Sequence, residues 1–374
     1  MPHIVGISAS TETYPNALAI ASIAKEANPT TTVVVGGPHT SVTHRQAAAE
    51  RDIDVVVRGE AEHTMLALAD CLASGADSLA AIEGITYVAD GIVTATGDRP
   101  AISDPDVLPL PARDLFPLPM YEQASSVLMS RGGCPCDCVF CAVNNIWKGR
   151  RRFRSADNVV KEVELLVERY GCDQISFADD TFTLSRRHAT NLCDRLLQVG
   201  AGRLLCEWRC TTRVDMVDHV LLETMRRAGC RSIAFGVESG SPRILDALGK
   251  GITREQVLHA VATSLDLGME VLCSFMFPHP DDTEDTIRQQ TEFMNTLANM
   301  GATVSLALTT PFPGTAYYEN ANAFGIRILT DRLDEFDGKH LVIATRHLSE
   351  DRLRSLLADL MRDVGVPSDT LQAF

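Results

Sequence analysis

The sequence predicts an α/β fold in two parts: a small doubly wound domain, then a partial barrel of six strand–helix units. Over residues 3–75, short apolar runs alternate with segments of helical periodicity. A proline-rich stretch, 98–121, then interrupts this pattern. From Val127 onward, strand, loop and helix patterns repeat as far as Leu308. Strands that alternate with helices form parallel sheets, so each part is expected to hold one such sheet.

The first part, residues 1–97, is the predicted doubly wound domain. Its strands are expected at 4–8, 31–37 and 54–58, its helices at 14–25 and 60–72, and a hairpin at 85–95. Asp90-Gly91 separates two alternating runs in the last segment, which is a hairpin signal. Ligands of doubly wound sheets bind beyond the carboxyl ends of the strands. Gly36 and Gly37 end the second strand and leave room for a ligand to approach the backbone.

Prolines mark the boundary between the two parts. Six of them lie between 98 and 121, and proline prevents helix and ladder formation, so this stretch is predicted to be an extended linker. The barrel is expected over 122–325 and a closing segment with an amphipathic helix over 326–374. After a first apolar run at 126–129, strands are expected at 174–178, 204–212, 232–237, 269–277 and 303–308, with helices between them at 186–199, 217–228, 254–267 and 284–300.

Composition narrows the class of protein. The chain has 374 residues, of which 45% are hydrophobic, and it contains no run of about 18 apolar residues, so no membrane span is expected. Its start lacks a basic region and a signal-peptide core, which predicts a cytoplasmic protein. The net charge of −15 argues against a nucleic-acid partner. Eleven scattered cysteines favour a reducing compartment, free thiols and one metal site.

That metal site is predicted at a short cysteine-rich loop. Cys134, Cys138 and Cys141 stand at the spacing C-x3-C-x2-C, after the first apolar run and a Gly-Gly pair. Thiolates on short loops hold iron–sulfur clusters, and three of them leave one iron of a 4Fe–4S cube open for a ligand. Phe140 precedes the last cysteine, where it can pack beside that ligand.

With this motif the chain resembles the radical SAM superfamily, whose signature is C-x3-C-x-aromatic-C. The resemblance implies a [4Fe–4S] cluster on Cys134, Cys138 and Cys141, with S-adenosylmethionine (SAM) chelated to the open iron beside Phe140. It also implies reductive cleavage of SAM to a 5′-deoxyadenosyl radical. A zinc site is the competing interpretation, although zinc favours four ligands and C-x2-C pairs. Cys136 lies inside the motif and could compete as a ligand.

The first domain resembles the C-terminal half of a cobalamin-binding domain. The resemblance rests on Val5-Gly6-Ile7-Ser8, Tyr14-Pro15-Asn16-Ala17, Gly36-Gly37-Pro38-His39 and Val57-Arg58-Gly59-Glu60. It implies a truncated Rossmann-like domain, since about one strand–helix unit is absent before the first phrase and no D-x-H-x2-G signature occurs. The favoured expectation is a remnant that packs against the barrel, with cobalamin binding as the alternative.

Polar residues at the predicted strand ends are the candidate SAM ligands. Asp179 and Asp180 stand where the family binds the methionyl amine, and a helix N-cap is the alternative. Arg213 resembles the family arginine near the SAM carboxylate, which its planar fork suits. Glu238 with Ser239 resembles the ribose motif, against the alternative of a surface acid.

Three further residues are candidates for contact with the substrate. Glu207 and Arg209 lie on one face of the third strand by its period of two, either facing a hydrated cavity or pairing with each other. His279 follows the fifth strand, as a structural hydrogen-bonding residue or as a proton donor or acceptor. Tyr317 and Tyr318, after the last strand, either line the substrate or pack.

A basic run, 148–154, follows the cysteine loop. Three interpretations stay open: a solvated patch, a docking face for an acidic electron donor such as flavodoxin or ferredoxin, and a site for an anionic substrate.

The sequence thus predicts a radical SAM enzyme that abstracts hydrogen from a small substrate, of a sugar or nucleoside type. The layout resembles compact antibiotic-pathway members of the superfamily, the cytosylglucuronate decarboxylases and aminoglycoside diol-dehydratases. Decarboxylation, dehydration or dehydrogenation is the expected outcome. A cobalamin-dependent radical methyltransferase is the second interpretation, and an iron–sulfur sensor without catalysis is the third.

Overall fold

A computed structural model describes residues 2–75, 78–121, 125–147, 151–201 and 204–365. The chain forms two compact units. The N-terminal unit comprises residues 1–103, 139–149 and 310–343, and the barrel unit comprises 104–138, 150–309 and 344–374. The chain therefore crosses between the units several times, whereas the sequence predicted consecutive domains. One crossing falls between Cys138 and Val139, inside the cysteine motif.

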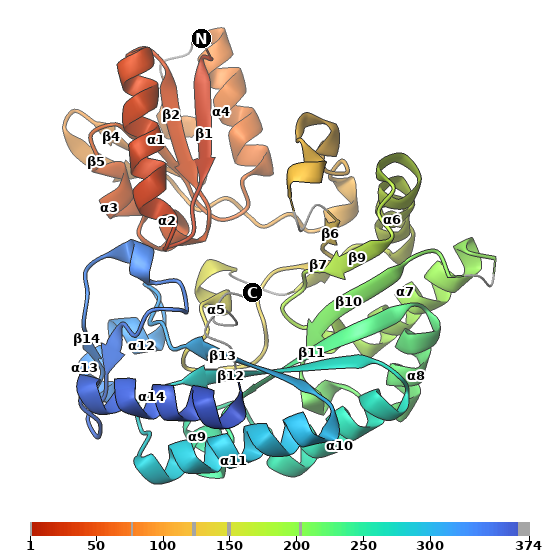
Figure 1. Ribbon diagram of the computed structural model, residues 1–374. Helices are drawn as coiled ribbons and strands as arrows, with labels where there is room; N and C mark the ends of the chain where they lie inside the picture. Colours follow the sequence, from red (N-terminus) through yellow and green to blue (C-terminus); the bar gives the residue numbers. More distant parts are fainter. Residues whose placement is uncertain (1, 76–77, 122–124, 148–150, 202–203, 366–374) are drawn as a thin grey trace. The chain divides into compact units, whose positions relative to one another are not determined.

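The N-terminal unit is built on a five-stranded sheet of order β1-β2-β3-β4-β5 (Figure 1). Its first three strands are parallel, and β4 and β5 form an antiparallel hairpin. The strands are β1 (Ile4–Ser8), β2 (Thr32–Gly36), β3 (Val55–Val57), β4 (Ile85–Ala89) and β5 (Ile92–Ala95). The longer helices are α1 (Tyr14–Ala27) and α4 (Glu62–Ser74), and the short ones are α2 (Pro38–Val42) and α3 (His44–Ala48).

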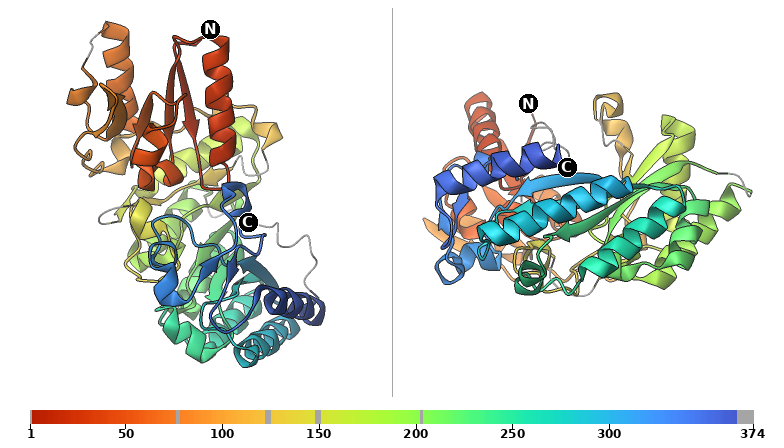
Figure 2. Two further views of the ribbon diagram at one scale, coloured as in Figure 1. Left: turned by 90° about the vertical axis from the view of Figure 1, so that its left-hand side faces the viewer. Right: turned by 60° about the horizontal axis from the view of Figure 1, so that its bottom comes forward.

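Helices cover both faces of this sheet, as the doubly wound prediction requires. Val33 and Val35 of β2 pack with the alanines of α1 and α3, while Val34 packs with Leu68 of α4 on the opposite face. Figure 2 shows the helices on either side of the strands. The predicted hairpin is confirmed: Asp90 and Gly91 both have positive φ, 50° and 77°. The sequence did not predict α2 and α3.

The barrel unit holds six strands in the order β13-β12-β11-β10-β9-β6, with all neighbours parallel. The predicted partial (β/α)6 barrel is therefore confirmed. The strands are β6 (Ser126–Val127), β9 (Gln174–Phe177), β10 (Glu207–Thr212), β11 (Cys230–Glu238), β12 (Glu270–Phe277) and β13 (Thr303–Leu308). The helices beside them are α6 (Ala156–Tyr170), α7 (Arg186–Val199), α8 (His219–Arg227), α10 (Arg254–Asp266) and α11 (Glu284–Met300), with α9 (Pro242–Ala247) after β11.

Alternation along each strand separates two faces of the barrel sheet. Trp208 and Cys210 are buried, while Arg209 and Thr211, which alternate with them, are exposed. The indole of Trp208 packs on Phe177 and Phe182 and donates to the carbonyl oxygen of Ala228, which caps α8. The buried side chains of this strand therefore face the helices, and the exposed ones face the interior of the barrel.

The C-terminal helix α14 (Glu350–Val364) lies beside α11, where Arg352 donates to Glu284 at 2.8 Å. Residues 310–343, which precede it, form the short helices α12 (Ala316–Glu319) and α13 (Ala321–Phe324) and the strand β14 (Arg327–Ile328). No helix among the described residues is long and apolar enough to cross a membrane.

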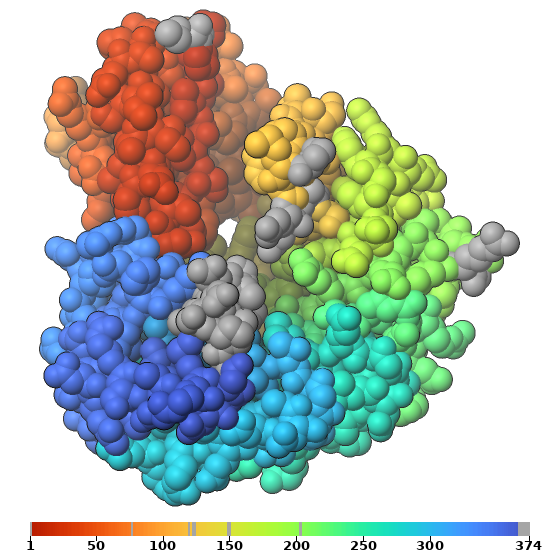
Figure 3. All heavy atoms as spheres, in the orientation of Figure 1, coloured from red at the N-terminus to blue at the C-terminus, as the bar shows by residue number. Residues whose placement is uncertain are grey.

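The proline-rich stretch folds differently from the extended linker that the sequence predicted. It forms three single-turn 3-10 helices at Pro105–Val107, Arg113–Leu115 and Leu118–Met120, and proline occupies one of the first two positions in the first and the third of these turns. Residues 98–103 belong to the N-terminal unit and 104–121 to the barrel unit. In Figure 3 the latter segment (gold) lies at the surface, where Leu115, Phe116 and Met120 are exposed.

Candidate functional site

Three thiols of the cysteine loop lie together in the barrel unit. Cys134, Cys136 and Cys138 are half-buried, and Cys136 forms a hydrogen bond with Cys134. Burial, more than any nearby charge, raises the pKa of Cys136 to about 11 and also raises that of Cys138. Cys141 and Phe140 are also half-buried and belong to the N-terminal unit. Soft sulfur donors on one short loop suit an iron–sulfur cluster.

The predicted ligand set of Cys134, Cys138 and Cys141 stays a prediction. Among the described residues, no three His, Cys, Asp or Glu side chains are arranged as a ready metal-binding group. The structure therefore does not decide between Cys134 and Cys136 as the first ligand. It does place two cations near the loop, since Arg213 and Lys250 both favour the thiolate of Cys138.

Asp179 and Asp180, at the end of β9, have different surroundings. Asp179 is buried and accepts from the backbone N–H of Met129 at 2.8 Å and from the hydroxyl of Ser130. Burial raises its pKa above the ordinary carboxyl value. Asp180 keeps a side chain that is 48% exposed and lies 3.4 Å from Arg151. Asp179 thus ties β9 to the chain entering the cysteine loop, and Asp180 is the carboxylate open to a ligand.

The alternative role of these aspartates as a helix N-cap is wrong. Ser185 caps α7, where its hydroxyl accepts from the backbone N–H of His188. Thr181 stands at the N-cap of the short turn before it.

The charged residues of β10 do not pair with each other, which was one alternative for them. Glu207 accepts from Arg231 at 2.6 Å, at the amino ends of β10 and β11. Arg209 is exposed on the inner face and donates to the hydroxyl of Ser176 at 3.3 Å. Arg213, just after the strand, donates from Nε and Nη2 to the two carboxylate oxygens of Asp215, both at 2.9 Å. Arg209 is thus the arginine of this strand that faces the barrel interior.

Glu238 ends β11 in a conformation unusual for a residue with a side chain, with φ at +69°. Its carboxylate accepts from Lys250 Nζ at 2.6 Å, and its carbonyl oxygen lies 3.0 Å from His279 Nε2. The neighbouring Ser239 is fully buried, and its hydroxyl accepts from the backbone N–H of Ser241 at 3.2 Å. Glu238 is therefore an inward carboxylate with fixed geometry, and not a surface acid.

His279 is buried, and its hydrogen bonds connect neighbouring loops of the barrel. Its backbone N–H donates to Asp282 at 2.7 Å and its Nε2 donates to Glu238, whereas Nδ1 has no hydrogen-bond partner within the described part of the chain. The structural alternative accounts for every contact of this ring. Its role as a proton donor or acceptor stays a prediction.

Sequence reasoning missed Lys250. The residue lies between Gly249 and Gly251, both with positive φ (66° and 68°), in the loop that follows α9. A lysine flanked by two glycines was the available signal, because such glycines permit a tight loop that can present a side chain inward. Lys250 is only 7% exposed.

Much of the basic run points inward. Arg151 is 6% exposed in its side chain and Arg154 is 12% exposed. Arg151 donates to the carbonyl oxygen of Gly133 at 3.1 Å and to Ser130 at 3.0 Å, and Arg154 pairs with buried Glu162 at 2.5 Å. The interpretation of the run as a solvated patch is wrong for these two arginines. Residues 148–150 lie outside the described residues.

Tyr317 is buried and packs edge-on against Phe324, with ring centroids 5.1 Å apart, which matches its packing alternative. Tyr318 is 37% exposed.

The carboxyl edge of the N-terminal sheet has the shape of a backbone cradle. Gly37 has φ at +101°, and a Cβ there would lie 2.7 Å from the carbonyl oxygen of Ala9. Buried hydroxyls of Tyr14 and Thr40 near this edge have no hydrogen-bond partner in the described part of the chain. Gly37 is therefore packed against the backbone at Ala9, which holds the loops after β1 and β2 together, and the unpaired hydroxyls beside these two loops fit a polar cofactor.

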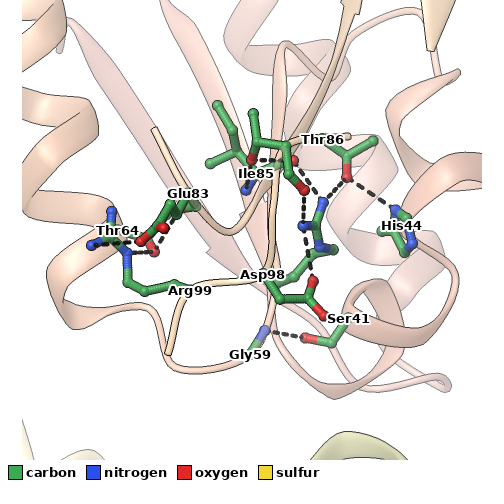
Figure 4. A network of polar contacts seen from close by, with 11 residues as sticks. Ser41, His44, Gly59, Thr64, Glu83, Ile85, Thr86, Asp98 and Arg99 are labelled. Atoms are coloured by element: carbon green, nitrogen blue, oxygen red, sulfur yellow. Dashed lines mark hydrogen bonds and ion pairs between the residues drawn. The ribbon is translucent and has the colours of Figure 1, made fainter. Parts of the chain in front are cut away.

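The buried Arg58 holds the adjoining loop after β3, and its partners Ile85, Thr86 and Asp98 are labelled in Figure 4. Arg58 donates to the carbonyl oxygens of Ile85 and Thr96 at 2.6 and 2.7 Å, and to Asp98 at 3.0 Å. The backbone N–H of Gly59 donates to Ser41 of α2 at 3.1 Å. These bonds join α2, the β3 loop and the hairpin into one rigid edge.

Two family models match the chain. A model described as the radical SAM superfamily matches residues 130–294, and a model described as the B12 binding domain matches residues 1–69. The second match covers the cradle at Gly37.

Curated relatives agree with these matches. The chain is 36% identical, over 360 residues, to an uncharacterized methyltransferase of Pyrococcus horikoshii, covering 95% of this chain and 77% of that protein. It is 30% identical to an anaerobic magnesium-protoporphyrin IX monomethyl ester cyclase of Rubrivivax gelatinosus, covering 94% of this chain and 63% of that protein.

Solved structures share the fold. The radical SAM methyltransferase TsrM from Kitasatospora setae, solved with cobalamin and a [4Fe–4S] cluster, matches with a TM-score of 0.76 at 19% identity, over 98% of this chain and 79% of that chain. The cobalamin-dependent radical enzyme OxsB, solved with aqua-cobalamin and SAM, matches with a TM-score of 0.77 at 18% identity, over 96% of this chain and 58% of that one.

Proposed function

Because the chain belongs to the radical SAM superfamily, in the group whose barrel is joined to a B12-binding domain, we propose that it is a cobalamin-dependent radical SAM methyltransferase. The observation that carries the proposal is the joint presence of the Gly37 cradle, inside the B12-binding match, and the thiol loop, inside the radical SAM match. The likeness to a methyltransferase over nearly the whole chain supports it.

This proposal replaces the elimination-type outcome that the sequence favoured. Decarboxylation, dehydration and dehydrogenation were expected because the N-terminal domain resembled a remnant that does not bind cobalamin. The B12-binding match at residues 1–69 removes that reason. The relatives quoted above are a methyltransferase and a cyclase, and none of them is a decarboxylase or dehydratase.

The chain's own residues have distinct tasks in this proposal. Cys134, Cys138 and Cys141 hold the cluster, and the carboxylates of Asp180 and Glu238 accept from SAM. When bound, the cluster and SAM supply a 5′-deoxyadenosyl radical, and cobalamin supplies the methyl carrier. The barrel interior shields the reacting carbon from water.

The substrate is proposed to be a small molecule with an anionic group. Arg209 is an exposed cation of the inner face, and it donates to the neutral hydroxyl of Ser176. A guanidinium with donors to spare suits a carboxylate or phosphate. We retain an acidic electron-transfer protein such as flavodoxin or ferredoxin as the reductant, without a docking role for Arg151 and Arg154.

Anaerobic reconstitution tests the function. The protein is loaded with iron, sulfide and hydroxocobalamin, desalted, and incubated with SAM carrying a CD3 group, dithionite and a panel of carboxylated and phosphorylated metabolites. We expect retained cobalamin absorbance, 5′-deoxyadenosine, and a product heavier by one CD3 group. Release of 5′-deoxyadenosine without retained cobalamin or methylated product would contradict the proposal and favour decarboxylation, dehydration or dehydrogenation instead. A bound cluster without any SAM cleavage would favour the sensor.

A further inference from the structure

The Lys250–Glu238 ion pair occupies the inner face of the barrel sheet directly above Gly236. A Cβ built on Gly236 would lie 2.6 Å from Glu238 Oε1 and 2.9 Å from Lys250 Nζ. The missing side chain at position 236 therefore provides the space in which the pair lies. The two side chains are only 6% and 12% exposed, so this is an enclosed pair and not a surface contact.

Hydrogen bonds to the backbone carbonyl oxygens of Lys250 and Glu238 hold both partners of the pair in place. The carbonyl oxygen of Lys250 accepts from Arg213 Nη2 at 2.6 Å, and Arg213 is itself fixed by Asp215. The carbonyl oxygen of Glu238 is held by His279. Two residues that the sequence marked as candidate site residues, Arg213 and His279, thus act on the backbone of the pair. They fix where its charges lie.

The pair lies beside the cysteine loop. Lys250, Arg213 and Glu238 all lie close enough to Cys138 for their charges to act on its sulfur. The loop carrying Lys250 also approaches the cysteine loop at the backbone, because a Cβ on Gly249 would lie 3.3 Å from the carbonyl oxygen of Asp137. The buried cations of Lys250 and Arg213 and the carboxylate of Glu238 therefore lie near the same thiol.

We propose that Lys250 is a positioning residue of the cofactor site, which holds the Glu238 carboxylate over Gly236 and places one positive charge beside the cluster ligand Cys138. The inference rests on the cluster and SAM site of the proposed function, and not on cobalamin or methyl transfer. Lys250 does not react with the substrate. It acts through Glu238 and through the electrostatic field at the cluster.

The two charges should affect the cluster in opposite directions. Reduction adds an electron, so a nearby cation stabilises the reduced cluster and a nearby anion destabilises it. Lys250→Met removes the cation and lowers the midpoint potential. Glu238→Gln removes the anion and raises it. A tenfold change in the reduction equilibrium corresponds to about 59 mV for one electron.

SAM binding should respond differently from the potential. Lys250→Met and Glu238→Gln both disturb the carboxylate offered to SAM, so both should weaken SAM affinity on the order of tenfold or more. Gly236→Ala keeps both charges, but its methyl group displaces the side chains of Lys250 and Glu238. It should therefore weaken SAM binding while shifting the midpoint potential less than Lys250→Met or Glu238→Gln does. Lys250→Arg keeps the charge and should restore the wild-type potential in part.

The experiment measures midpoint potential by redox titration followed by electron paramagnetic resonance, and SAM affinity by equilibrium binding, on the reconstituted full chain. Arg231→Met is the matched control, since Arg231 pairs with Glu207 at the same 2.6 Å but begins β11, roughly 20 Å along the strand from Glu238. It should leave both quantities unchanged. Iron content and thermal unfolding are recorded for each variant.

Opposite shifts of potential for Lys250→Met and Glu238→Gln, with both weakening SAM binding, support the inference. Shifts of the same sign, or no shift at unchanged iron content, overturn it. A wild-type protein that binds no cluster overturns the proposed function as well, so the two failures can be told apart. If Lys250→Met does not fold, a raised potential in Glu238→Gln together with a retained potential in Lys250→Arg supports the inference, and an unchanged potential in Glu238→Gln overturns it.

Discussion

Arg151 donates from Nε to the carbonyl oxygen of Gly133, 3.1 Å away, and Gly133 directly precedes the first cysteine of the loop. The same guanidinium donates to Ser130 at 3.0 Å and lies 3.4 Å from Asp180. One nearly buried side chain therefore joins the start of the cysteine loop to the end of β9.

The first prediction concerns this arginine. Arg151→Met should lower the iron retained after anaerobic reconstitution by at least half, because the loop loses its anchor at Gly133, while Arg151→Lys should recover only part of it. Iron and sulfide analysis after desalting is the measurement. Arg352→Met, which removes an exposed pair on α14, is the control and should retain wild-type iron. Equal iron in Arg151→Met and wild type would contradict the role.

The second prediction concerns the buried charge cluster around Glu162. Its carboxylate is 1% exposed and contacts Arg113 at 2.6 Å and Arg154 at 2.5 Å. Glu162→Gln leaves two buried guanidinium groups without their counter-charge, so we expect a loss of about 3–5 kcal/mol in the free energy of unfolding. Urea denaturation measures it. Asp157→Asn, which removes the exposed Arg195 pair, should leave the free energy of unfolding nearly unchanged, because water screens this pair. Similar losses in both variants would refute the distinction.

The third prediction compares two glycines of positive φ in the N-terminal unit. Gly37 (φ +101°) has no room for a Cβ, whereas Gly91 (φ +77°) has nothing within 4 Å of that position. Gly37→Ala should abolish cobalamin retention on desalting, because the cradle must distort. Gly91→Ala should retain cobalamin and lose only about 1 kcal/mol of stability from backbone strain. Absorbance of the desalted protein is the readout, and retention by Gly37→Ala would count against the cradle.

The fourth prediction is a pH dependence that arises from His39. Burial lowers the pKa of this ring, against a weaker opposite effect of Glu12, and the ring contacts Thr11 and the ring of Tyr14. Its folded pKa lies below the unfolded value of about 6.5. The stability it contributes is therefore fully present above that value and is lost as the pH falls through the folded pKa.

Hydrogen exchange of the β2 amides between pH 7.5 and 5, corrected for the intrinsic rate, is the measurement. The wild-type unit should lose protection on acidification more steeply than His39→Gln. His63→Gln, on an exposed position of α4, should follow the wild type. Identical slopes for wild type and His39→Gln would exclude His39 as the cause.

The regular elements were largely predictable from the sequence. Apolar periodicity predicted β1, α7, α11 and β13 with their observed bounds, because each of these segments has a clear buried face. The glycine at position 37 and the cysteine spacing indicated ligand sites for local reasons of conformation and chemistry. These signals lie within a few neighbouring residues, so they can be recognised in the sequence before the fold is known.

Long-range pairing could not be predicted in this way. Arg154 looked like part of a surface patch because its partner, Glu162, lies on a helix whose buried side is not visible in a charge count. The role of Arg213 near the SAM carboxylate stays a prediction, and no local signal indicated that its Nε and Nη2 donate to Asp215 and to the carbonyl oxygen of Lys250. Lys250 was overlooked because its partner, Glu238, is twelve positions away, across a turn and a short helix.

Trp208 has a practical consequence for measuring these effects. The chain has two tryptophans, and this one is buried in the barrel unit, while Trp147 belongs to the N-terminal unit. In a Trp147→Phe background, the fluorescence emission of a single indole reports the melting of the barrel alone. The red shift that follows exposure of that indole to water then separates damage to the barrel from damage to its companion unit, without any added dye.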